Sequence, residues 1–413
     1  MFNEVWLILA GFVMLVGLVL HQDGLMTISS LLLTVAGVGW VWKHFALRCV
    51  EYERKFSERR AFVGEVIDLT ITVTNRKPLP LAWLRIEDEY PLPVGLLDGT
   101  LAPCNKPETA YLTNLLSLRW YERVRWRYRL QCSQRGVYAF GPAKISSGDL
   151  FGLFSESVIS PKINWLIVYP QVRPLEDFEL PPKEPFGEIK ARQRIFEDPS
   201  RTIGVRDYHA EDALKRIHWK ATARQQKLQV RVYEPTTIQQ LAIFMNIATL
   251  PKVWHGVIPS LLEKVISVTA SIAAYGIERR WQVGVLANGC WPQSDQPLKV
   301  LPGRSPDQLT SILESLAAVT SVPTISIEEF IARESPRLPW GATLVVVSAV
   351  LTEELLVVLA RLHDAGRRLA LVSLDEKVPA PQVPGLLLYR VREDGEVFRM
   401  EPLEEVADAH SVA

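Results

Sequence analysis

Two long apolar runs without charge stand at the start of this chain and constrain its fold more than any other feature. Residues 5–20 form the first run and residues 25–42 the second, with a short polar break at residues 21–24. Each run approaches the roughly 20 residues that a helix needs to cross about 30 Å of hydrocarbon. The pattern predicts a transmembrane helical hairpin; a secretory signal peptide and a pair of buried core helices are the alternatives.

The charges around these runs favour the hairpin and orient it. A signal peptide fits poorly, because no basic segment precedes the first run and a second apolar run follows at once. The polar break has no Lys or Arg, whereas basic residues cluster just after the second run: Lys43, Arg48, Arg54, Lys55, Arg59 and Arg60. Because positive charge favours the cytoplasmic side, we expect a cell-membrane protein with two helices, and with both termini and the soluble domains in the cytoplasm.

The bulk composition excludes several classes of protein. The 46 basic residues balance the 46 acidic residues, so no global positive charge points to nucleic acid. The four cysteines have neither metal nor redox spacing and predict free thiols in a reducing compartment: Cys49, Cys104, Cys132 and Cys290. The length of 413 residues allows several domains.

A β-rich pattern follows the apolar runs and covers residues 49–168. Residues 66–73 alternate between apolar and polar, as in a half-buried strand. In the segment RVRWRYRLQC, apolar residues alternate with a row of four arginines: Arg123, Arg125, Arg127 and Arg129. Short strands at this spacing predict a small β-sandwich. The arginine row either contacts anionic lipid headgroups or, as we favour, forms a solvated strand face with carboxylate partners such as Glu87 and Asp88.

The C-terminal half, residues 236–413, alternates buried strands with amphipathic helices. The strands are typified by LAIFMNIA, WQVGVLAN and ATLVVVSAV. Gly276 is placed to end the first helix, and Thr352 to cap the last. This order predicts an open, mostly parallel sheet with helices on both faces. A proline-rich connector and a helix–strand motif, residues 169–235, separate it from the β-sandwich, and residues 1–48 hold the hairpin.

The segment GVRDYHAEDALKRIHWKATARQQKLQVRVYE, residues 204–234, is rich in charge. We expect Asp212 to cap a helix that runs through about Arg224. On that helix Arg216, Lys220 and Arg224 fall at i, i+4 and i+8 and form a cationic stripe. Trp219 points away from the packed side, so we expect its side chain to be buried against another part of the chain.

Three interpretations of this segment stay open. The first is a structural ion network in which Asp207 and Asp212 pair with Arg206, Arg216 or Arg224. The second is docking of an acidic partner through the cationic stripe. The third is catalysis by His218 with a nearby carboxylate such as Asp212; a lone histidine beside an apolar helix face is more often structural.

The same segment resembles the central motif of a bacterial family known as domain of unknown function 58. The matching positions are Gly204, Arg206, Tyr208, Asp212, Arg216, Ile217, His218, Trp219, Lys220, Ala223, Arg224 and Glu234. The segments QRGVYAFGP and DLFGLF also resemble the lead-in of that family. The resemblance implies an N-terminal transmembrane pair, a von Willebrand factor A-like C-terminal domain and a partnership with AAA+ ATPases of the MoxR type. It implies no cofactor and no established activity.

The chain departs from metal-binding von Willebrand A domains at one place. Those domains carry Asp-x-Ser-x-Ser after the first strand, whose oxygens hold Mg²⁺. Here the segment FMNIATL has Asn246, Ala248 and Leu250 at those positions, and Ser348 and Ala349 follow a later strand. Ligand number and charge are both too low for a hard cation, so we predict a degenerate site without metal.

These observations together predict a membrane-anchored cytoplasmic adaptor or assembly factor that is not an enzyme. It would work with a MoxR-type ATPase and with other membrane proteins, and its membrane contact would be residues 5–42. Two other functions remain as alternatives. One is a hydrolase or transferase that uses His218, and the other is a structural component of cell-envelope assembly.

Overall fold

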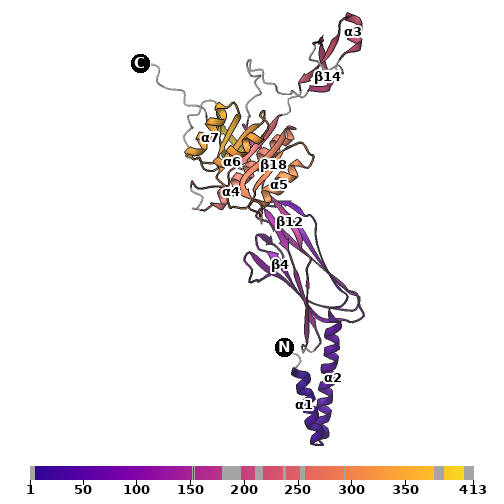
Figure 1. Cartoon of the computed structure of the whole chain (residues 1–413). Coiled ribbons are helices and arrows are strands. Elements are labelled where there is room, and N and C mark those ends of the chain that lie inside the picture. Colours follow the sequence, from indigo (N-terminus) through magenta and orange to yellow (C-terminus); the bar gives the residue numbers. More distant parts are fainter. Residues whose placement is uncertain are drawn as a thin grey trace. The chain divides into compact units, whose positions relative to one another are not determined.

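The computed structural model divides the chain into two compact units. It describes residues 5–150, 152, 154–178, 197–209, 217–235, 239–251, 256–292, 294–375 and 386–403. One unit comprises Met1–Gln171 with Leu313–Ala318, and the other comprises Val172–Ile312 with Val319–Ala413. Figure 1 labels the elements of both units.

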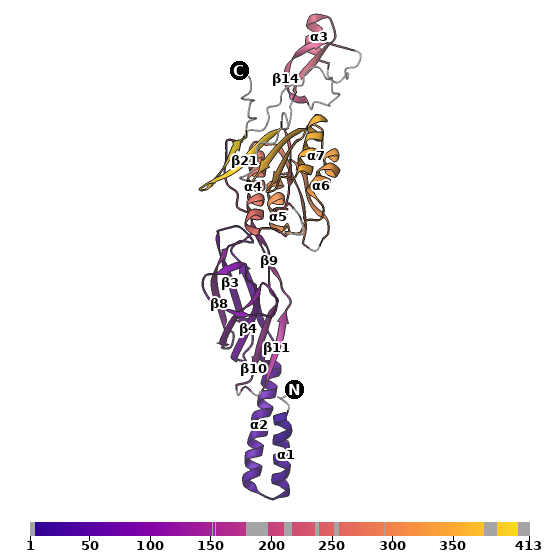
Figure 2. The ribbon, with the colours of Figure 1, turned by 90° about the vertical axis from the view of Figure 1, so that its left-hand side faces the viewer.

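The first unit begins with a helical hairpin. Helix α1 spans Val5–Val19 and helix α2 spans Asp23–Ala46. They run antiparallel and side by side (Figure 2), as the apolar runs predict. Among the described helices, α2 and α4 (Pro259–Glu278) are long and apolar enough to cross a membrane. Only 17% of the apolar window of α2 is buried, against 56% in α4, so α4 is the core helix of its own unit.

Three sheets follow the hairpin in the first unit. The first has the order β1-β3-β8-β5, the second β11-β10-β4-β7-β6 and the third β2-β12-β9. Their bounds are β1 Val50–Phe56, β2 Arg60–Phe62, β3 Val66–Asn75, β4 Leu81–Pro91, β5 Val94–Leu96, β6 Leu101–Pro103, β7 Thr109–Leu118, β8 Arg123–Cys132, β9 Gly136–Phe140, β10 Ala143–Gly148, β11 Ser155–Ser160 and β12 Asn164–Tyr169.

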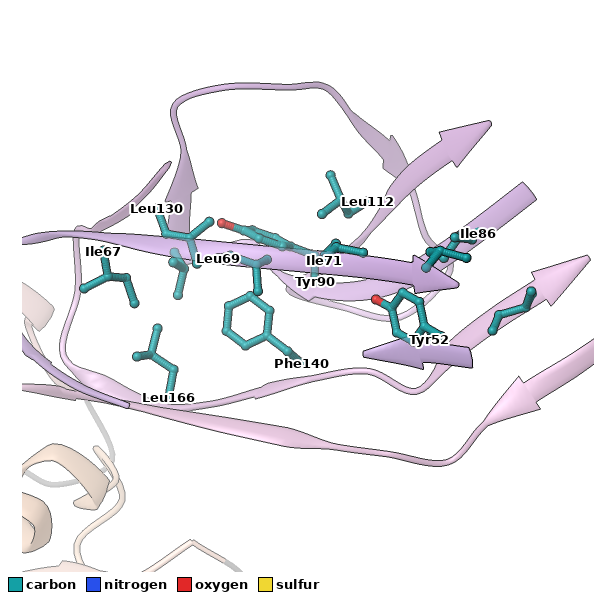
Figure 3. Close-up of a cluster of buried hydrophobic side chains, with 14 of the residues drawn as sticks. Tyr52, Ile67, Leu69, Ile71, Ile86, Tyr90, Leu112, Leu130, Phe140 and Leu166 are labelled. Carbon is teal, nitrogen blue, oxygen red and sulfur yellow. The ribbon is translucent and has the colours of Figure 1, made fainter. Parts of the chain in front are cut away.

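One hydrophobic core joins these sheets. Because side chains alternate between the faces of a strand, every second residue of β3 is buried, among them Ile67, Leu69 and Ile71. They pack with Ile86 and Tyr90 of the neighbouring sheet in the cluster of Figure 3. The predicted β-rich part is confirmed, since most of its strand pairs are antiparallel.

The predicted carboxylate partners of the arginine row are wrong. Arg129 pairs with Asp98 through two hydrogen bonds of 2.7 and 2.9 Å. Asp88 is buried instead, where its carboxylate accepts hydrogen bonds from Tyr52 at 2.5 Å and from Arg54 at 3.0 Å. Glu87 lies near basic residues of its own sheet. The prediction failed because β4, which carries both carboxylates, belongs to a different sheet from β8.

The second unit contains an eight-stranded sheet with the order β13-β22-β21-β20-β19-β16-β17-β18. Strands β17, β16, β19, β20 and β21 are parallel, and β18 and β22 pair antiparallel at either side. The bounds are β13 Leu175–Glu176, β16 Gln240–Met245, β17 Gln282–Cys290, β18 Pro297–Gly303, β19 Thr343–Ser348, β20 Arg368–Ser373, β21 Leu387–Asp394 and β22 Val397–Pro402. The predicted mostly parallel sheet is present.

Helices cover both faces of this sheet. Alternate strand residues such as Phe244 and Val346 pack under α6 (Ile327–Glu334) and α7 (Glu353–Asp364). Residues of opposite parity face α4, where Gly276 lies against Leu241 and Val283. This unit also holds the short 3-10 helix η4 (Ser335–Arg337) and the start of helix α5 (Gln308–Ala318), whose residues Leu313–Ala318 are grouped with the first unit. Thr352 caps α7 as predicted, since its hydroxyl accepts a hydrogen bond from the N–H of Leu355.

Gly276 does not end α4, which continues to Glu278. A Cβ at Gly276 would lie 2.8 Å from Cγ2 of Val283, so the glycine serves close packing of helix on sheet. The connector partly joins this unit: β13 pairs with β22, and Phe178 packs against Tyr275 and Tyr389. The rest of the proline-rich connector, residues 179–196, lies outside the described residues.

Candidate functional site

The motif segment forms a small antiparallel hairpin with one helix inserted. Strand β14 (Glu197–Asp207) pairs with β15 (Gln229–Pro235), and helix α3 (Trp219–Gln225) lies between them in the chain. Gly204 pairs with Val232 and Asp198 with Glu234 across the strands. Arg206 lies near the end of β14 and Tyr208 just after it. Asp212 and Arg216 lie outside the described residues, so their predicted roles stay predictions.

Helix α3 starts later than the sequence pattern suggests. His218, not Asp212, caps it: the Nδ1 atom of His218 accepts a hydrogen bond of 3.1 Å from the N–H of Ala221. The preceding Ile217 is buried and forms an isolated β-bridge with Val230. The prediction of one helix from Asp212 to Arg224 is therefore wrong, because Ile217 has the pairing of a strand residue. Only Lys220 and Arg224 of the expected cationic stripe share this helix.

Gln229 ties the helix to the hairpin, a role that sequence reasoning missed. Its backbone N–H donates to the hydroxyl of Thr222 at 3.0 Å, and its carbonyl accepts from the N–H of His218 at 2.7 Å. Its buried side-chain amide donates to the carboxylate of Asp207. Arg206 donates to the carbonyl of Asp207 at 3.1 Å. Because Asp212 and Arg216 lie outside the described residues, the predicted ion network of Asp207 and Asp212 with Arg206, Arg216 or Arg224 stays a prediction.

One face of α3 exposes an aromatic side chain and two cationic side chains to solvent. Trp219 has 68% of its surface exposed, so the expectation that it is buried elsewhere is wrong. Lys220 and Arg224 are exposed as well. At about 100° per residue, these three side chains share one side of the helix, and Ala221 and Thr222 occupy the more enclosed side. We name Trp219, Lys220 and Arg224 the α3 face; it suits contact with an apolar and acidic surface.

A second polar group lies where the strand order of the large sheet reverses, between β16 and β19. In open α/β sheets, ligands bind outside the carboxyl ends of the strands at such a point. Asn246 follows β16, Asn288 lies near the end of β17 and Ser348 ends β19. All three are buried, with exposed fractions of 4%, 1% and 0%. We name these three residues the strand-end network.

The polar atoms of the strand-end network form hydrogen bonds with one another and with nearby backbone groups. The Nδ2 of Asn246 donates to Oγ of Ser348 at 3.0 Å, and its Oδ1 accepts from the amide of Asn288 at 3.1 Å. That oxygen also accepts from the backbone N–H of Ala248 at 3.1 Å. The hydroxyl of Ser348 in turn donates to the carbonyl of Val350 at 2.6 Å. The network is neutral and well satisfied, as buried polar groups require.

The other two positions of the degenerate metal site bring no oxygen from their side chains. Ala248 contributes its backbone N–H, and Leu250 is an alkyl side chain. Thr249 lies between them, and its hydroxyl accepts from the N–H of Ile258 at 2.6 Å. Among the described residues, no three His, Cys, Asp or Glu side chains gather closely enough to hold a metal ion. The absence of metal stays a prediction, now supported by the engaged oxygen of Asn246.

Comparison with known proteins places the motif in a larger domain. The family model described as "Protein of unknown function DUF58" matches residues 204–400, from the α3 hairpin through most of the large sheet. The uncharacterized protein YeaD of Bacillus subtilis (strain 168) is 23% identical over 352 residues, which is 84% of this chain and 81% of that protein. The family match thus begins at the motif segment, whereas the similarity to YeaD covers most of the chain.

Two solved structures each resemble a small part of this chain. The CARDB domain of the PF1109 protein from Pyrococcus furiosus is 13% identical, with 29% of this chain and 86% of that chain covered and a TM-score of 0.20. A cohesin–dockerin complex from Clostridium thermocellum is 11% identical, with 29% and 99% covered and a TM-score of 0.21. Likeness at this level carries no functional argument.

Proposed function

The chain is a member of the DUF58 family, and from that premise we propose that it is a membrane-anchored, non-catalytic adaptor that docks a partner through the α3 face. The observation that carries the proposal is the exposure of Trp219 beside two cations on a helix that is itself held firmly to its hairpin. An exposed Trp with basic neighbours has the composition of a binding hot spot. The partner therefore presents an apolar pocket with acidic residues around it.

The anchor in this proposal is the α1–α2 hairpin. Helix α2 has 24 residues, or about 36 Å at 1.5 Å per residue, which is enough to cross the hydrocarbon core. The positive residues that follow it favour a cytoplasmic location for the two units. The adaptor would thus hold its partner near the inner face of the cell membrane.

We further assign the large sheet to the von Willebrand A-like class. Counted within the domain, the strand order from β18 to β21 is 3-2-1-4-5-6, with the third strand antiparallel. That order is the doubly wound arrangement that places a site at the reversal point. The neutral strand-end network occupies this point and leaves no acidic oxygen for a cation, which supports a role in protein contact and not in metal-dependent adhesion or hydrolysis.

The partner that we propose is an AAA+ ATPase of the MoxR type, as the family resemblance implies. The competing enzymatic proposal needs His218 as an acid or base, yet the Nδ1 atom of His218 already accepts the capping hydrogen bond. A histidine whose Nδ1 atom is engaged at a helix start favours the docking role. Assembly of the cell envelope remains compatible with the adaptor, since a client membrane protein would contact other surfaces of the chain.

The test measures binding of the ATPase to the full-length protein. Affinity purification from membranes, read by mass spectrometry, identifies the partner, and its affinity is then measured with purified proteins in detergent. We expect Trp219→Ala to weaken binding by about tenfold or more. The double substitution Lys220→Glu with Arg224→Glu should do the same and should also reduce the salt dependence of association.

Trp120→Ala is the matched control for Trp219→Ala. Trp120 also has 68% of its surface exposed, but it lies in the turn between β7 and β8 of the other unit. Its loss should leave the affinity unchanged. Equal affinity of the wild type, the Trp219 variant and the charge-reversed variant, all folded by circular dichroism, would refute docking through the α3 face.

A further inference from the structure

An apolar groove lies where helix α2 meets the β-rich part of the same unit. One wall comes from the last turns of α2 and the other from the loop between β3 and β4, and the groove has a volume of about 510 Å³. Its lining includes Val38, Val41 and Phe45 of the helix and Lys77, Pro78 and Leu79 of the loop. The three helix side chains are exposed, so the groove is accessible along the helix.

Lys77 fixes the loop wall to the end of the helix. Its Nζ donates to the carbonyl of Ala46 and, at 2.7 Å, to the carbonyl of Arg48. The carbonyl of Ala46 is one of those left without helical partners at the C-terminus of α2, where a cation is favourable. Burial lowers the pKa of Lys77 from its ordinary value. The ammonium of Lys77 is hydrogen-bonded at the end of α2. Lys77 therefore holds the loop wall of the groove in place and does not add a free charge to the lining.

A second basic residue, Arg48, lies beside the groove. The guanidinium of Arg48 lies 4.9 Å from the centre of the Phe45 ring, which lines the groove. Its Nη2 is 2.8 Å from Nε2 of His44. Arg48 is exposed, and its planar fork suits phosphate oxygens. An apolar trough with an arginine at one end matches a molecule with a hydrocarbon chain and an anionic head.

Aromatic residues surround the same end of the unit. Trp120 and Tyr121 occupy the turn between β7 and β8, with 68% and 67% of their surfaces exposed. The N–H of Tyr121 donates to the carbonyl of Lys77 at 3.3 Å, so this turn adjoins the loop that forms the groove wall. Exposed Trp and Tyr are typical of the level of lipid headgroups, which places the groove at the membrane surface.

We propose that this groove is a binding site for an anionic phospholipid. One acyl chain lies along Val38, Val41 and Phe45, and the phosphate contacts the guanidinium of Arg48. The proposal rests on the membrane anchor of the proposed function. It goes beyond general contact with the bilayer, because it assigns one lipid to a defined groove that the soluble part of the unit completes.

Gly37 provides a sharp test, because it also lines the groove and a Cβ there would meet nothing within 4 Å. A Gly37→Leu side chain would therefore extend into the groove without disturbing the helix. The probe is phosphatidylglycerol with a diazirine in its acyl chain, in nanodiscs that hold the full-length protein. We expect crosslinks in the peptides around residues 37–45 and 77–79, and a loss of about fivefold or more in Gly37→Leu.

Gly11→Leu is the matched control, because Gly11 is a helical glycine of α1 that also faces open space. It should leave the crosslinks at the groove unchanged. Equal crosslinking in Gly37→Leu and the wild type would overturn the site. Resistance to carbonate extraction is measured in parallel. It shows whether the protein is integrated in the membrane, so loss of anchoring is distinguished from loss of lipid binding in the groove.

The contact between the lipid headgroup and Arg48 is tested separately. Native mass spectrometry compares phosphatidylglycerol with phosphatidylcholine bound to the detergent-solubilised protein. We expect the wild type to retain the anionic lipid preferentially and Arg48→Gln to reduce that preference several-fold. An undiminished preference in Arg48→Gln would contradict the contact between phosphate and guanidinium.

Discussion

Asn246 shows how a single amide changes the chemistry of a strand end. A carboxylate at this position would be an acceptor only, whereas the amide donates to Ser348 and accepts from Asn288 at the same time. Every polar atom in this buried group therefore has a complementary neighbour. The amide stabilises the packed ends of β16, β17 and β19 where an acidic residue would need a cation beside it.

We predict that Asn246→Asp lowers the free energy of unfolding by about 2–3 kcal/mol. The carboxylate would lose the hydrogen bond to Ser348, whose own proton is engaged by the carbonyl of Val350, and burial disfavours its charge. Urea or thermal unfolding of the solubilised protein measures the change. Millimolar Mg²⁺ should not restore stability, because Ala248 and Leu250 supply no oxygen from their side chains.

Two results would contradict this interpretation of the strand-end network. One is recovery of the Asn246→Asp variant by Mg²⁺. The other is tight binding of Mg²⁺ or Mn²⁺ by the wild type that is lost in Asn246→Ala. Ser311→Ala provides a comparison at a polar residue of α5 away from this network, and it should respond to neither metal.

At the scale of elements, the sequence predicted the buried strands better than the motif helix. Strands such as β16 and β19 are apolar on both faces, so their hydrophobic runs allow only a central position in a sheet. The short segment around Ile217 was ambiguous, because its apolar spacing fits a helix although Ile217 in fact pairs with Val230. That pairing depends on β15 (Gln229–Pro235), which the apolar spacing around Ile217 does not include.

The two candidate sites show the same contrast between features that the sequence reveals and features that depend on the fold. The exchange of Asp-x-Ser-x-Ser for Asn246, Ala248 and Leu250 is visible in the sequence, and the lack of metal ligands follows from the residue types alone. The closing partner Asn288 comes from another strand, and it becomes recognisable only once β17 lies beside β16. The exposure of Trp219 likewise depends on where α3 begins.

The edge strand β18 is attached to helix α6 through Glu334. This buried carboxylate accepts from Lys299 of β18 at 2.7 Å and from Arg337 at 3.0 Å. Burial alone would raise the pKa of Glu334, but the hydrogen bonds and charges of Lys299 and Arg337 outweigh it and hold the pKa below its ordinary value. The ionised form is thus favoured by folding.

The sign of the resulting pH dependence follows from this depressed pKa. Glu334 contributes stability at pH values above its ordinary pKa of about 4.3, and the contribution is lost as the pH falls through the lower folded value. We predict that Glu334→Gln costs about 2 kcal/mol of unfolding free energy near pH 7. The difference from the wild type should shrink as the pH is lowered from about 6 to about 3. A constant difference over that range would exclude the ionised carboxylate as its cause.

At the scale of the whole molecule, the proposed attachment and the proposed docking fall in different units of the chain. The first unit carries the hairpin, and its helix α2 ends inside the same hydrophobic core as the strands, where Ala46 is fully buried. The second unit carries the α3 face and the large sheet. Under the proposed function, the chain would hold a partner at the membrane, and we expect attachment and docking to be separable by substitutions in different units.

The orientation of the α1–α2 hairpin in the membrane can be tested with two cysteine positions. Cys49 is exposed just beyond α2, and Gly24 lies in the first turn of α2 with open space around it. In a chain whose native cysteines are alanine, each position carries the single thiol, as restored Cys49 or as Gly24→Cys. Because positive charge favours the cytoplasm, a membrane-impermeant maleimide should label Gly24→Cys in intact cells and Cys49 only after permeabilisation. The reverse pattern would invert the topology, and labelling of neither site before permeabilisation would show that the hairpin does not span the membrane.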